Sequence, residues 1–438
     1  MENIKDKYRK IQFTPETISA AYARISRADK SVDKLRIQAL KDIERCRKSN
    51  KEIVFEMGHS SIAEHAVFNF DIIGISRYLT EFVQRTRLAS FTEKSQRYIT
   101  LKGDYVLPEE IKNDPKIADE FCSIIEKQNQ AYFSLYKSLK DYYRLKSSTN
   151  LTKLKAKEDA RYIISLATKT QMGMTINARS IERLLKRLYA IPFMEASELA
   201  DKIYKEVKSV APSLIRYVKP SRYDENRYLT KFFPKMKNLT EKCQSKLLYY
   251  TDNCDEKILT ALLFRKTGNS WGRVRKQVMQ MSLPEKKKQI LDCLKDIANY
   301  DSLPREFEIC DFTFQLNISA SCFAQLKRHR MSTIIVSDYH PKYGFTIPES
   351  IVRIGKKEDF ERVIKVTENF YYKLAEAYPT IKNYILTNAH HRLVLFKLNL
   401  RELCNFSRLR EDSNAQWEIR ELAHKIVSEC KKVAPLTT

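Results

Sequence analysis

The chain has 438 residues, and its 79 Lys and Arg residues outnumber 54 Asp and Glu residues, giving a formal charge of +25. This length predicts two or three domains at roughly 150 residues each, and the 43% of hydrophobic residues excludes a largely disordered chain. No apolar run approaches the roughly 18 residues that span a bilayer. Residues 1–13 lack the apolar core of a signal peptide. We therefore expect a cytoplasmic protein without a membrane segment.

The excess of basic residues has two explanations. A polyanionic partner, such as nucleic acid or several phosphorylated small molecules, would account for it. A lysine-rich surface that reflects genome composition would account for it equally well. Because the basic residues are spread along the chain rather than gathered in one arm, the charge alone does not select nucleic acid.

Glycine and cysteine usage excludes several common sites. The eight glycines form neither a GxGxxG fingerprint nor a Walker loop, so neither nucleotide-binding motif is present. The nine cysteines are an odd number without a CxxC pair, which argues against a disulfide framework and against a structural zinc site. We expect most of them to be small buried apolar residues.

Helical and strand-like patterns alternate along the chain. Residues 66–70 and 309–314 alternate apolar and polar side chains, as a strand with one buried face does. Asn177 and Asn399 each open an amphipathic pattern that predicts a helix. The fold class is therefore mixed α+β, rich in helix, with a small sheet in each half. Four further stretches carry a helical pattern: 18–47, 117–145, 196–211 and 358–378.

The second half of the chain repeats motifs of the first half in the same order. Arg85-Thr86-Arg87 is followed by Asn177-Ala178-Arg179, and Arg328-His329-Arg330 is followed by Asn399-Leu400-Arg401. Two similar segments in the same order indicate a tandem duplication. The polar stretch at 220–228 contains a proline. We place the boundary there, which predicts two similar domains at 1–224 and 225–438.

Two polar segments of the first half carry residues suited to chemistry. In residues 58–65, His59, Ser61 and Glu64 lie close together before the first strand; they could bind a metal, or Ser60 or Ser61 could simply cap a helix. Residues 85–98 crowd three arginines, two serines and a glutamate into one stretch. Guanidinium forks and a serine hydroxyl suit a phosphate, although a solvated charged loop would have the same composition.

Residues 85–98, with Arg-x-Arg followed by Ser95 and Arg97, resemble the signature of flavin-dependent thymidylate synthases. The resemblance covers both halves of the chain and is weaker around 105–155 and 225–300. It implies two tandem thymidylate synthase-like domains that convert dUMP to dTMP. The cofactor would be FAD, with methylenetetrahydrofolate and NADPH as cosubstrates. The other matching segments are 58–64, 160–162, 177–180, 399–412 and 415–420.

Each repeat departs from the family pattern at different positions. In the first repeat, Thr86, Phe82, Leu188 and Arg183 replace the expected histidine, glutamine, late arginine and second asparagine. In the second repeat those four residues are present. That repeat departs from the pattern elsewhere: Val336, Asp338, His340 and Asn383 replace the expected glutamate, serine and two arginines. It also lacks the His59 segment, although Glu308 is the candidate counterpart of Glu64.

These losses are complementary, so the two repeats together predict one complete site and one dead reciprocal site. By resemblance, the catalytic residues are Arg410, which stabilises negative charge on the uracil, together with Ser95 and His59. The nucleotide is bound by Gln325, Arg328, Glu93, Ser95, Gln96, Arg97, Arg161 and Arg410. FAD is held by His59, Ser61, Glu64, His329, Arg330, Asn399, Arg401 and Asn405. Asn414 stands where the family often has histidine, and Trp417 is expected in the core.

Two other functions fit the same residues. The flavin core could act on a pyrimidine of another nucleotide or of nucleic acid, by methylation or hydroxymethylation, or the protein could bind nucleotide and flavin without turnover. Sparing of one whole composite site argues against the inactive protein. The resemblance also implies a homodimer that assembles four repeats.

Overall fold

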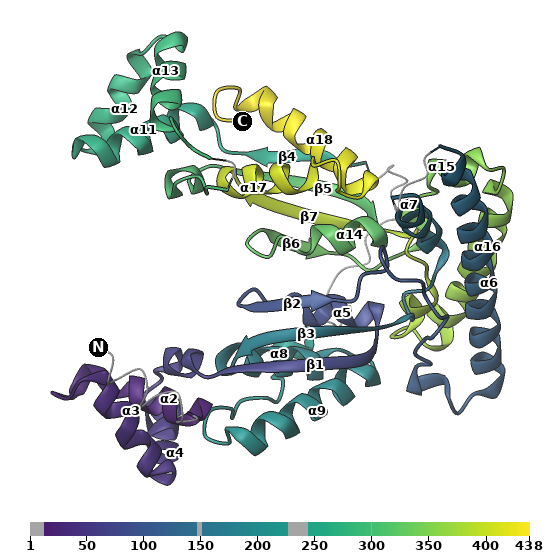
Figure 1. The fold of residues 1–438 in the computed structure, drawn as a ribbon, viewed down its shortest axis with the longest axis horizontal. Helices are drawn as coiled ribbons and strands as arrows, with labels where there is room; N and C mark the ends of the chain where they lie inside the picture. The colour runs from purple at the N-terminus through teal and green to yellow at the C-terminus, as the bar shows by residue number, and fades with distance from the viewer. Residues whose placement is uncertain (1–12, 147–150, 227–243, 299) are drawn as a thin grey trace. The chain divides into compact units, whose positions relative to one another are not determined.

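The computed structural model describes residues 13–146, 151–226, 244–298 and 300–438, which divide into two compact units (Figure 1). Unit 1 comprises Met1–Asn129, Ser165–Asn238 and Asn369–Ile385, and unit 2 comprises Gln130–Ile164, Leu239–Glu368 and Leu386–Thr438. Each unit therefore contains a segment from the opposite half of the sequence. The predicted boundary between residues 224 and 225 adjoins residues 227–243, which lie outside the described residues, and it stays a prediction.

Unit 1 is built on a three-stranded antiparallel sheet. Its strands β1 (Val67–Ser76), β3 (Lys169–Asn177) and β2 (Ala89–Glu93) pair in the order β1-β3-β2. Side chains of β3 alternate between buried and exposed, and α8 and α9 cover one face of the sheet (Figure 1). The helices are α2 (Pro15–Ala23), α3 (Val32–Lys41), α4 (Ile43–Lys51), α5 (Arg77–Val83), α8 (Ala178–Ala190), α9 (Met194–Val210) and α10 (Arg222–Asn226), with short turns η1 (Ile25–Arg27), η2 (Glu52–Glu56), η3 (Ser60–His65) and η4 (Glu109–Ile111).

Unit 2 contains a four-stranded antiparallel sheet. Strands β4 (Lys246–Tyr250), β5 (Asp311–Ser319), β7 (His391–Asn399) and β6 (Thr333–Val336) pair in the order β4-β5-β7-β6. One face packs against α17 and α18 around a core that includes Phe314, Phe396 and Phe406. The helices are α7 (Leu151–Ala160), α11 (Cys254–Thr267), α12 (Trp271–Gln280), α13 (Leu283–Cys293), α14 (Ala320–Leu326), α15 (Glu349–Arg353), α17 (Leu400–Arg410) and α18 (Trp417–Val433), with short turns η5 (Arg161–Ile163), η7 (Arg305–Glu308) and η8 (Pro341–Tyr343).

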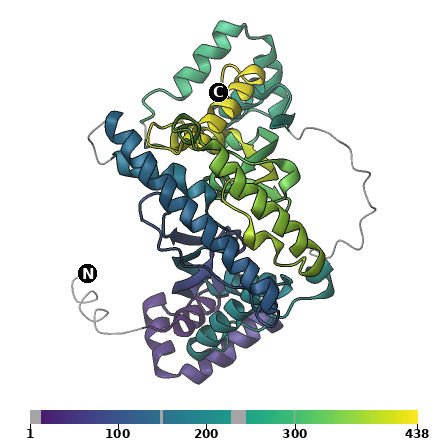
Figure 2. The ribbon, with the colours of Figure 1, turned by 90° about the vertical axis from the view of Figure 1, so that its right-hand side faces the viewer.

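Two long helices, α6 (Pro115–Lys146) and α16 (Lys357–Ala377), contribute residues to both units (Figure 2). In unit 1, the first half of α6 packs on the last turns of α16, where the Phe121 and Phe370 ring centroids lie 6.4 Å apart and Lys373 pairs with Glu120. The turn after α16, η9 (Lys382–Ile385), then enters unit 1. Residues of the second repeat are therefore part of the core of unit 1.

The mixed α+β class and the duplicated architecture are confirmed. Both predicted strands form, as parts of β1 and β5, and Asn177 and Asn399 occupy the N-cap positions of α8 and α17. The helical stretch predicted at 18–47 is broken into three helices: the segment 24–31 separates α2 from α3, and Asp42 leaves the helical conformation between α3 and α4 and caps α4. No helix of the described part of the chain is both long and apolar enough to cross a bilayer.

Candidate active site

In both repeats, an asparagine at the N-cap position fixes where a functional helix begins. Asn399 Oδ1 accepts a hydrogen bond of 2.9 Å from Glu402 N and thereby starts α17, as Asn177 Oδ1 does for α8 with Ser180 N at 2.9 Å. Ser319 caps α14 in the same manner. Asparagine and serine are preferred at this position because their side-chain oxygen satisfies a free backbone N–H. Asn399, which is predicted to hold FAD, thus uses its side-chain oxygen for the cap.

Unit 2 brings together Arg410, Gln325 and His329. Arg410, the last residue of α17, donates from Nη1 to Gln325 Oε1 (3.3 Å) and from Nη2 to the Gln325 carbonyl (3.1 Å). Its Nε donates to His329 Nε2 at 2.9 Å. These three bonds fix the guanidinium plane, which a lysine ammonium could not reproduce. The predicted late arginine and the predicted glutamine therefore form one cluster.

His329 lies between Arg410 and Glu402 in this cluster and is neutral. Its Nδ1 lies 3.0 Å from Glu402 Oε1, and its ring meets Phe406 edge-on at 4.9 Å. Burial lowers the pKa of His329, partly opposed by the Glu402 hydrogen bond. Since Nε2 accepts from Arg410, the ring proton resides on Nδ1 and is donated to Glu402. Glu402 thus orients His329, and His329 orients Arg410.

Arg161 joins this unit from the opposite half of the sequence. It lies in η5, is 4% exposed, and its carbonyl accepts from Asn388 Nδ2 at 3.0 Å. Burial raises the pKa of the Cys322 thiol well above its usual range, and the charges of Arg410 and Arg161 partly oppose this rise. Arg161 and Arg410 therefore come from opposite halves of the sequence and belong to the same unit.

The five predicted flavin residues of the second repeat belong to the same unit. Arg401 pairs through Nη1 with Glu308 at 2.8 Å and donates from Nε to the Leu303 carbonyl at 2.6 Å. In unit 1, Arg179 pairs with Glu64, which is the same arrangement and supports the correspondence between Glu308 and Glu64. The remaining predicted flavin residues of unit 2 are the half-buried Arg330 and Asn405, whose side chain accepts from Arg408 at 3.2 Å.

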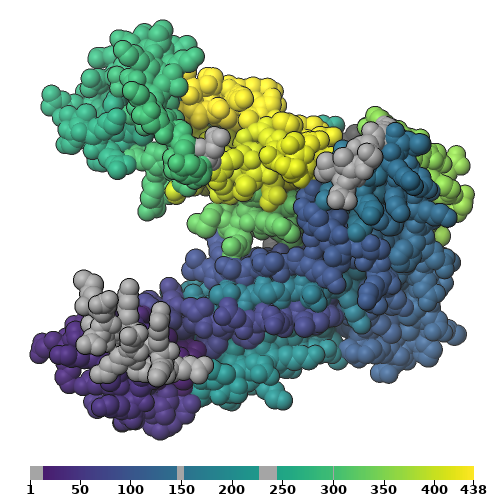
Figure 3. Space-filling model, in the orientation of Figure 1, coloured from purple at the N-terminus to yellow at the C-terminus, as the bar shows by residue number. Residues whose placement is uncertain are grey.

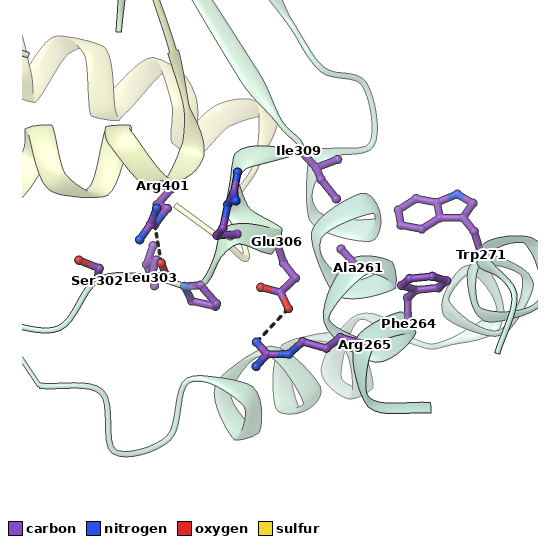
Figure 4. Close-up of a pocket in the computed structure, with 11 residues that line it drawn as sticks. Ala261, Phe264, Arg265, Trp271, Ser302, Leu303, Glu306, Ile309 and Arg401 are labelled. Carbon is purple, nitrogen blue, oxygen red and sulfur yellow. Dashed lines mark hydrogen bonds and ion pairs between the residues drawn. The ribbon is translucent and has the colours of Figure 1, made fainter. Parts of the chain in front are cut away.

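Arg401 also lines an open cavity of about 860 Å³ (Figure 4). Phe264 and Trp271 form its opposite end, with ring centroids 6.4 Å apart. Arg265 and Arg305 line it as well, and so does Glu306, which pairs with Arg265 at 3.3 Å, while Arg305 pairs with Glu308 at 3.2 Å. The cavity thus combines apolar walls with three guanidinium groups and one carboxylate. Such a lining suits a ligand that carries both a flat ring and negative charge.

The other predicted site residues lie in unit 1. Glu93 accepts from Arg77 Nη1 at 2.6 Å and from Gln84 Nε2 at 2.8 Å. Ser95 Oγ accepts from Arg97 N at 3.2 Å, which shapes the turn after β2. His59 and Ser61 are exposed, Glu64 is half-buried, and Gln96 is buried. His59, rather than Ser60 or Ser61, precedes η3, and no side chain caps that turn.

The position in unit 1 that corresponds to the Arg410 cluster is filled with aromatic rings. Phe82 stands where the other repeat has Gln325, and it meets Tyr78 and Phe193 at 5.1 and 5.5 Å. Tyr384 completes the cluster at 5.4 Å from Tyr78, and Leu188, in place of Arg410, is fully buried. Asn383, the counterpart of Arg161, donates to the Tyr78 hydroxyl at 2.9 Å. The reciprocal position has therefore become hydrophobic core.

A buried carboxylate in each unit binds the segment taken from the opposite repeat. In unit 2, Glu418 accepts from the Tyr162 hydroxyl at 2.6 Å and from Ser319 Oγ at 2.5 Å. In unit 1, Glu195 accepts from the Tyr384 hydroxyl at 2.5 Å and from Ser76 Oγ at 2.7 Å. Sequence reasoning missed this pair, although the Ser and Glu residues occur at corresponding places in the two repeats.

Three further expectations concern metal, thiols and Trp417. Among the described residues there is no group of three or more His, Cys, Asp or Glu side chains that could hold a metal ion. The eight cysteines within the described ranges are free thiols; Cys243 lies outside those ranges. Trp417 is half-buried, stacks on Tyr162 at 5.8 Å and donates from Nε1 to Asp159 at 3.0 Å. Its ring is thus engaged within the protein.

Sequence comparison gives the family. The family model for thymidylate synthase complementing protein (Thy1) matches residues 11–213 and again residues 246–436. The chain therefore belongs to this family and contains two copies of its domain.

Similar proteins follow the same division. A UPF0159 protein, Ta1429, from Thermoplasma acidophilum is 25% identical over 433 residues, covering 88% of this chain and 86% of its own length. Flavin-dependent thymidylate synthases of Clostridium tetani and Geobacter sulfurreducens are 32% and 31% identical. They match 50% and 47% of this chain and 89% and 83% of their own lengths. A full-length similar protein thus has both repeats, whereas these flavin-dependent enzymes correspond to one.

Proposed function

We propose that this protein is an FAD-dependent thymidylate synthase that methylates C5 of dUMP at one composite site per pair of unlike repeats. In the overall reaction, dUMP, methylenetetrahydrofolate, NADPH and a proton give dTMP, tetrahydrofolate and NADP⁺. The observation that carries the proposal is the cluster in which Gln325 and His329 hold Arg410, together with Arg161 in the same unit. The proposed setting is a cytoplasmic homodimer of four repeats.

The nucleotide would be held by charge. Arg161 and Arg328 would hold the phosphate and sugar, together with Ser95 and Arg97 contributed by the first repeat, through charge-assisted hydrogen bonds. Glu93, Gln96 and Gln325 would complete the polar lining. Asp338 replaces the serine that the reciprocal site would need, and a carboxylate against a phosphate would oppose binding. Together with Leu188 and Asn383 in place of the two arginines, this difference would restrict the reaction to one site.

Arg410 would face the uracil ring. As C5 becomes nucleophilic, negative charge develops on the ring, and a guanidinium held rigidly against it stabilises that charge without reorganisation. His329 acts as a positioning residue, because it accepts from Arg410 Nε and is itself fixed by Glu402. Neutral His329 leaves the positive charge of the cluster on Arg410.

The residues of unit 2 fit FAD at its pyrophosphate. Arg401 lies at the edge of the 860 Å³ cavity, its side chain 37% exposed, so its guanidinium is accessible to an anion. Arg330, Asn405 and the cap residue Asn399 would surround it, with His59, Ser61 and Glu64 on the flavin side from the first repeat. When bound, FAD supplies the hydride that reduces the transferred carbon.

Tritium release from [5-³H]dUMP tests the proposal on the purified protein with FAD, NADPH and methylenetetrahydrofolate. Arg410→Lys should lower kcat by about 10²- to 10³-fold, the usual loss of one preorganised electrostatic group, and Arg161→Asn should raise KM for dUMP. The matched control changes, Leu188→Met and Asn383→Ala, should leave both constants within about twofold. Equal losses in the two sets, or no release with the unaltered protein, would refute the one-site reaction.

A further inference from the structure

Helices α11, α12 and α13 form a small helical lobe of unit 2, visible at the upper left of Figure 3. Its own core consists of Leu259, Val274, Val278 and Ile290. The three helices carry nine Lys and Arg residues against four Asp and Glu residues. The three helices therefore carry a formal charge of +5.

The charge is concentrated on α12, which contains no acidic residue. Arg273, Arg275 and Lys276 are all exposed, and within the described structure none of them takes part in a hydrogen bond or ion pair. Such solvated cations are available to the phosphates of a polyanion. The corresponding helix of the first repeat, α3, carries Asp33 in its first turn and no aromatic residue.

Two aromatic rings adjoin these charges. Trp271 is 37% exposed and Phe264 is 47% exposed, and they meet edge-on at the open end of the cavity (Figure 4). Arg275 follows Trp271 by four residues, so the two side chains lie on neighbouring turns of one helix face. Arg265 and Arg305 lie beside Phe264 in the same lining and are 74% and 84% exposed, although they pair with Glu306 at 3.3 Å and with Glu308 at 3.2 Å.

We propose that this basic aromatic surface, formed by Phe264, Arg265, Trp271, Arg273, Arg275, Lys276 and Arg305, binds single-stranded nucleic acid. Cations that follow a backbone, next to exposed rings on which bases stack, are the arrangement that binds single strands without sequence preference. A duplex keeps its bases inside and would leave the aromatic pair unused. Phe264, Arg265, Trp271 and Arg305 line the cavity whose edge Arg401 is proposed to offer to FAD. Arg273, Arg275 and Lys276 lie outside that lining and apart from Arg410, so binding of a strand does not require the proposed reaction.

The test is fluorescence anisotropy of a labelled (dT)₂₀ or U₂₀ strand titrated with the full chain in the presence of FAD. We expect binding that weakens with salt, because each neutralised phosphate contributes about −0.7 to the slope of log K against log salt. Arg273→Gln, Arg275→Gln and Lys276→Gln together should reduce that slope by about 2. Trp271→Ala should weaken binding about tenfold through lost stacking.

The matched control neutralises Lys202, Lys205 and Lys208, three exposed lysines on α9 of unit 1, and it should leave the affinity unchanged. All altered side chains except Trp271 are well exposed, so circular dichroism should be that of the unaltered protein; Trp271→Phe should retain most of the affinity. The proposal is overturned if neither strand binds at 50 mM salt or if both triple variants lose affinity equally. A duplex that binds as tightly as the single strand, or preference for anionic lipid vesicles, would also overturn it.

Discussion

Removal of the Tyr162 hydroxyl tests most directly how the second repeat binds a segment of the first. Tyr162 is fully buried. It donates to Glu418 Oε2 at 2.6 Å and accepts from Gln416 Nε2 at 2.7 Å. Tyr162→Phe removes the oxygen while keeping the ring on Trp417. The change therefore isolates two hydrogen bonds from the packing that surrounds them.

The expected loss follows from these two bonds. At a pH where Glu418 is ionised, a hydrogen bond to this charged group contributes about 1.5–3 kcal/mol, and leaving the buried amide of Gln416 without its acceptor costs about 1–3 kcal/mol. Because the two effects share one oxygen and are not additive, we expect the free energy of unfolding to fall by about 3 kcal/mol. Tyr384→Phe in unit 1 loses the single bond to Glu195 at 2.5 Å, so about 2 kcal/mol is expected.

Urea unfolding followed by Trp417 fluorescence measures the first change, in a background where Trp271→Phe removes the other tryptophan. Trp417 stacks on Tyr162 at 5.8 Å, so its emission reports locally on this contact. Tyr384→Phe is the matched control, because its hydroxyl lies in the other unit, and it should shift the unfolding transition reported by Trp417 emission less than Tyr162→Phe does. A Tyr162→Phe variant with the midpoint and slope of the unaltered protein would refute the reasoning.

Three other predictions concern pH and backbone conformation. Burial raises the folded-state pKa of Glu418 above 4.5, so the folded protein retains a proton that the unfolded chain loses. This contribution to the free energy of unfolding therefore disappears as pH rises above 4.5. Glu418→Gln should flatten the pH dependence of that free energy, measured by urea titrations between pH 4.5 and 8. Burial lowers the pKa of His329 below 6.5, so the contribution of the neutral ring to the free energy of unfolding is lost as pH falls below 6.5. In His329→Gln that free energy should not show this decrease, and a pH dependence equal to that of the unaltered protein would contradict the prediction. Gly268 ends α11 at φ +64°, so Gly268→Ala should lower thermal stability by about 1 kcal/mol, whereas Gly272→Ala inside α12 should not lower it.

Local sequence determined the elements and the family. Alternation of apolar residues predicted β1 and β5, and the two Asn-x-Arg motifs predicted helix starts, because a strand face and an N-cap depend on residues that are neighbours in sequence. The resemblance to flavin-dependent thymidylate synthases rested on the order of short polar motifs, and both family matches confirm it. The complementary losses also followed from sequence, since each is a single substitution.

Tertiary structure decided which groups meet. That Arg161 shares a unit with Arg410, and Asn383 one with Tyr78, depends on packing between residues more than 200 positions apart, which no local pattern contains. The same holds for the aromatic cluster around Phe82: each substitution is visible in the sequence, but only packing of distant segments shows that the rings fill one space. Whether a buried side chain packs well depends on its neighbours in three dimensions, and those neighbours come together only when the whole chain has folded.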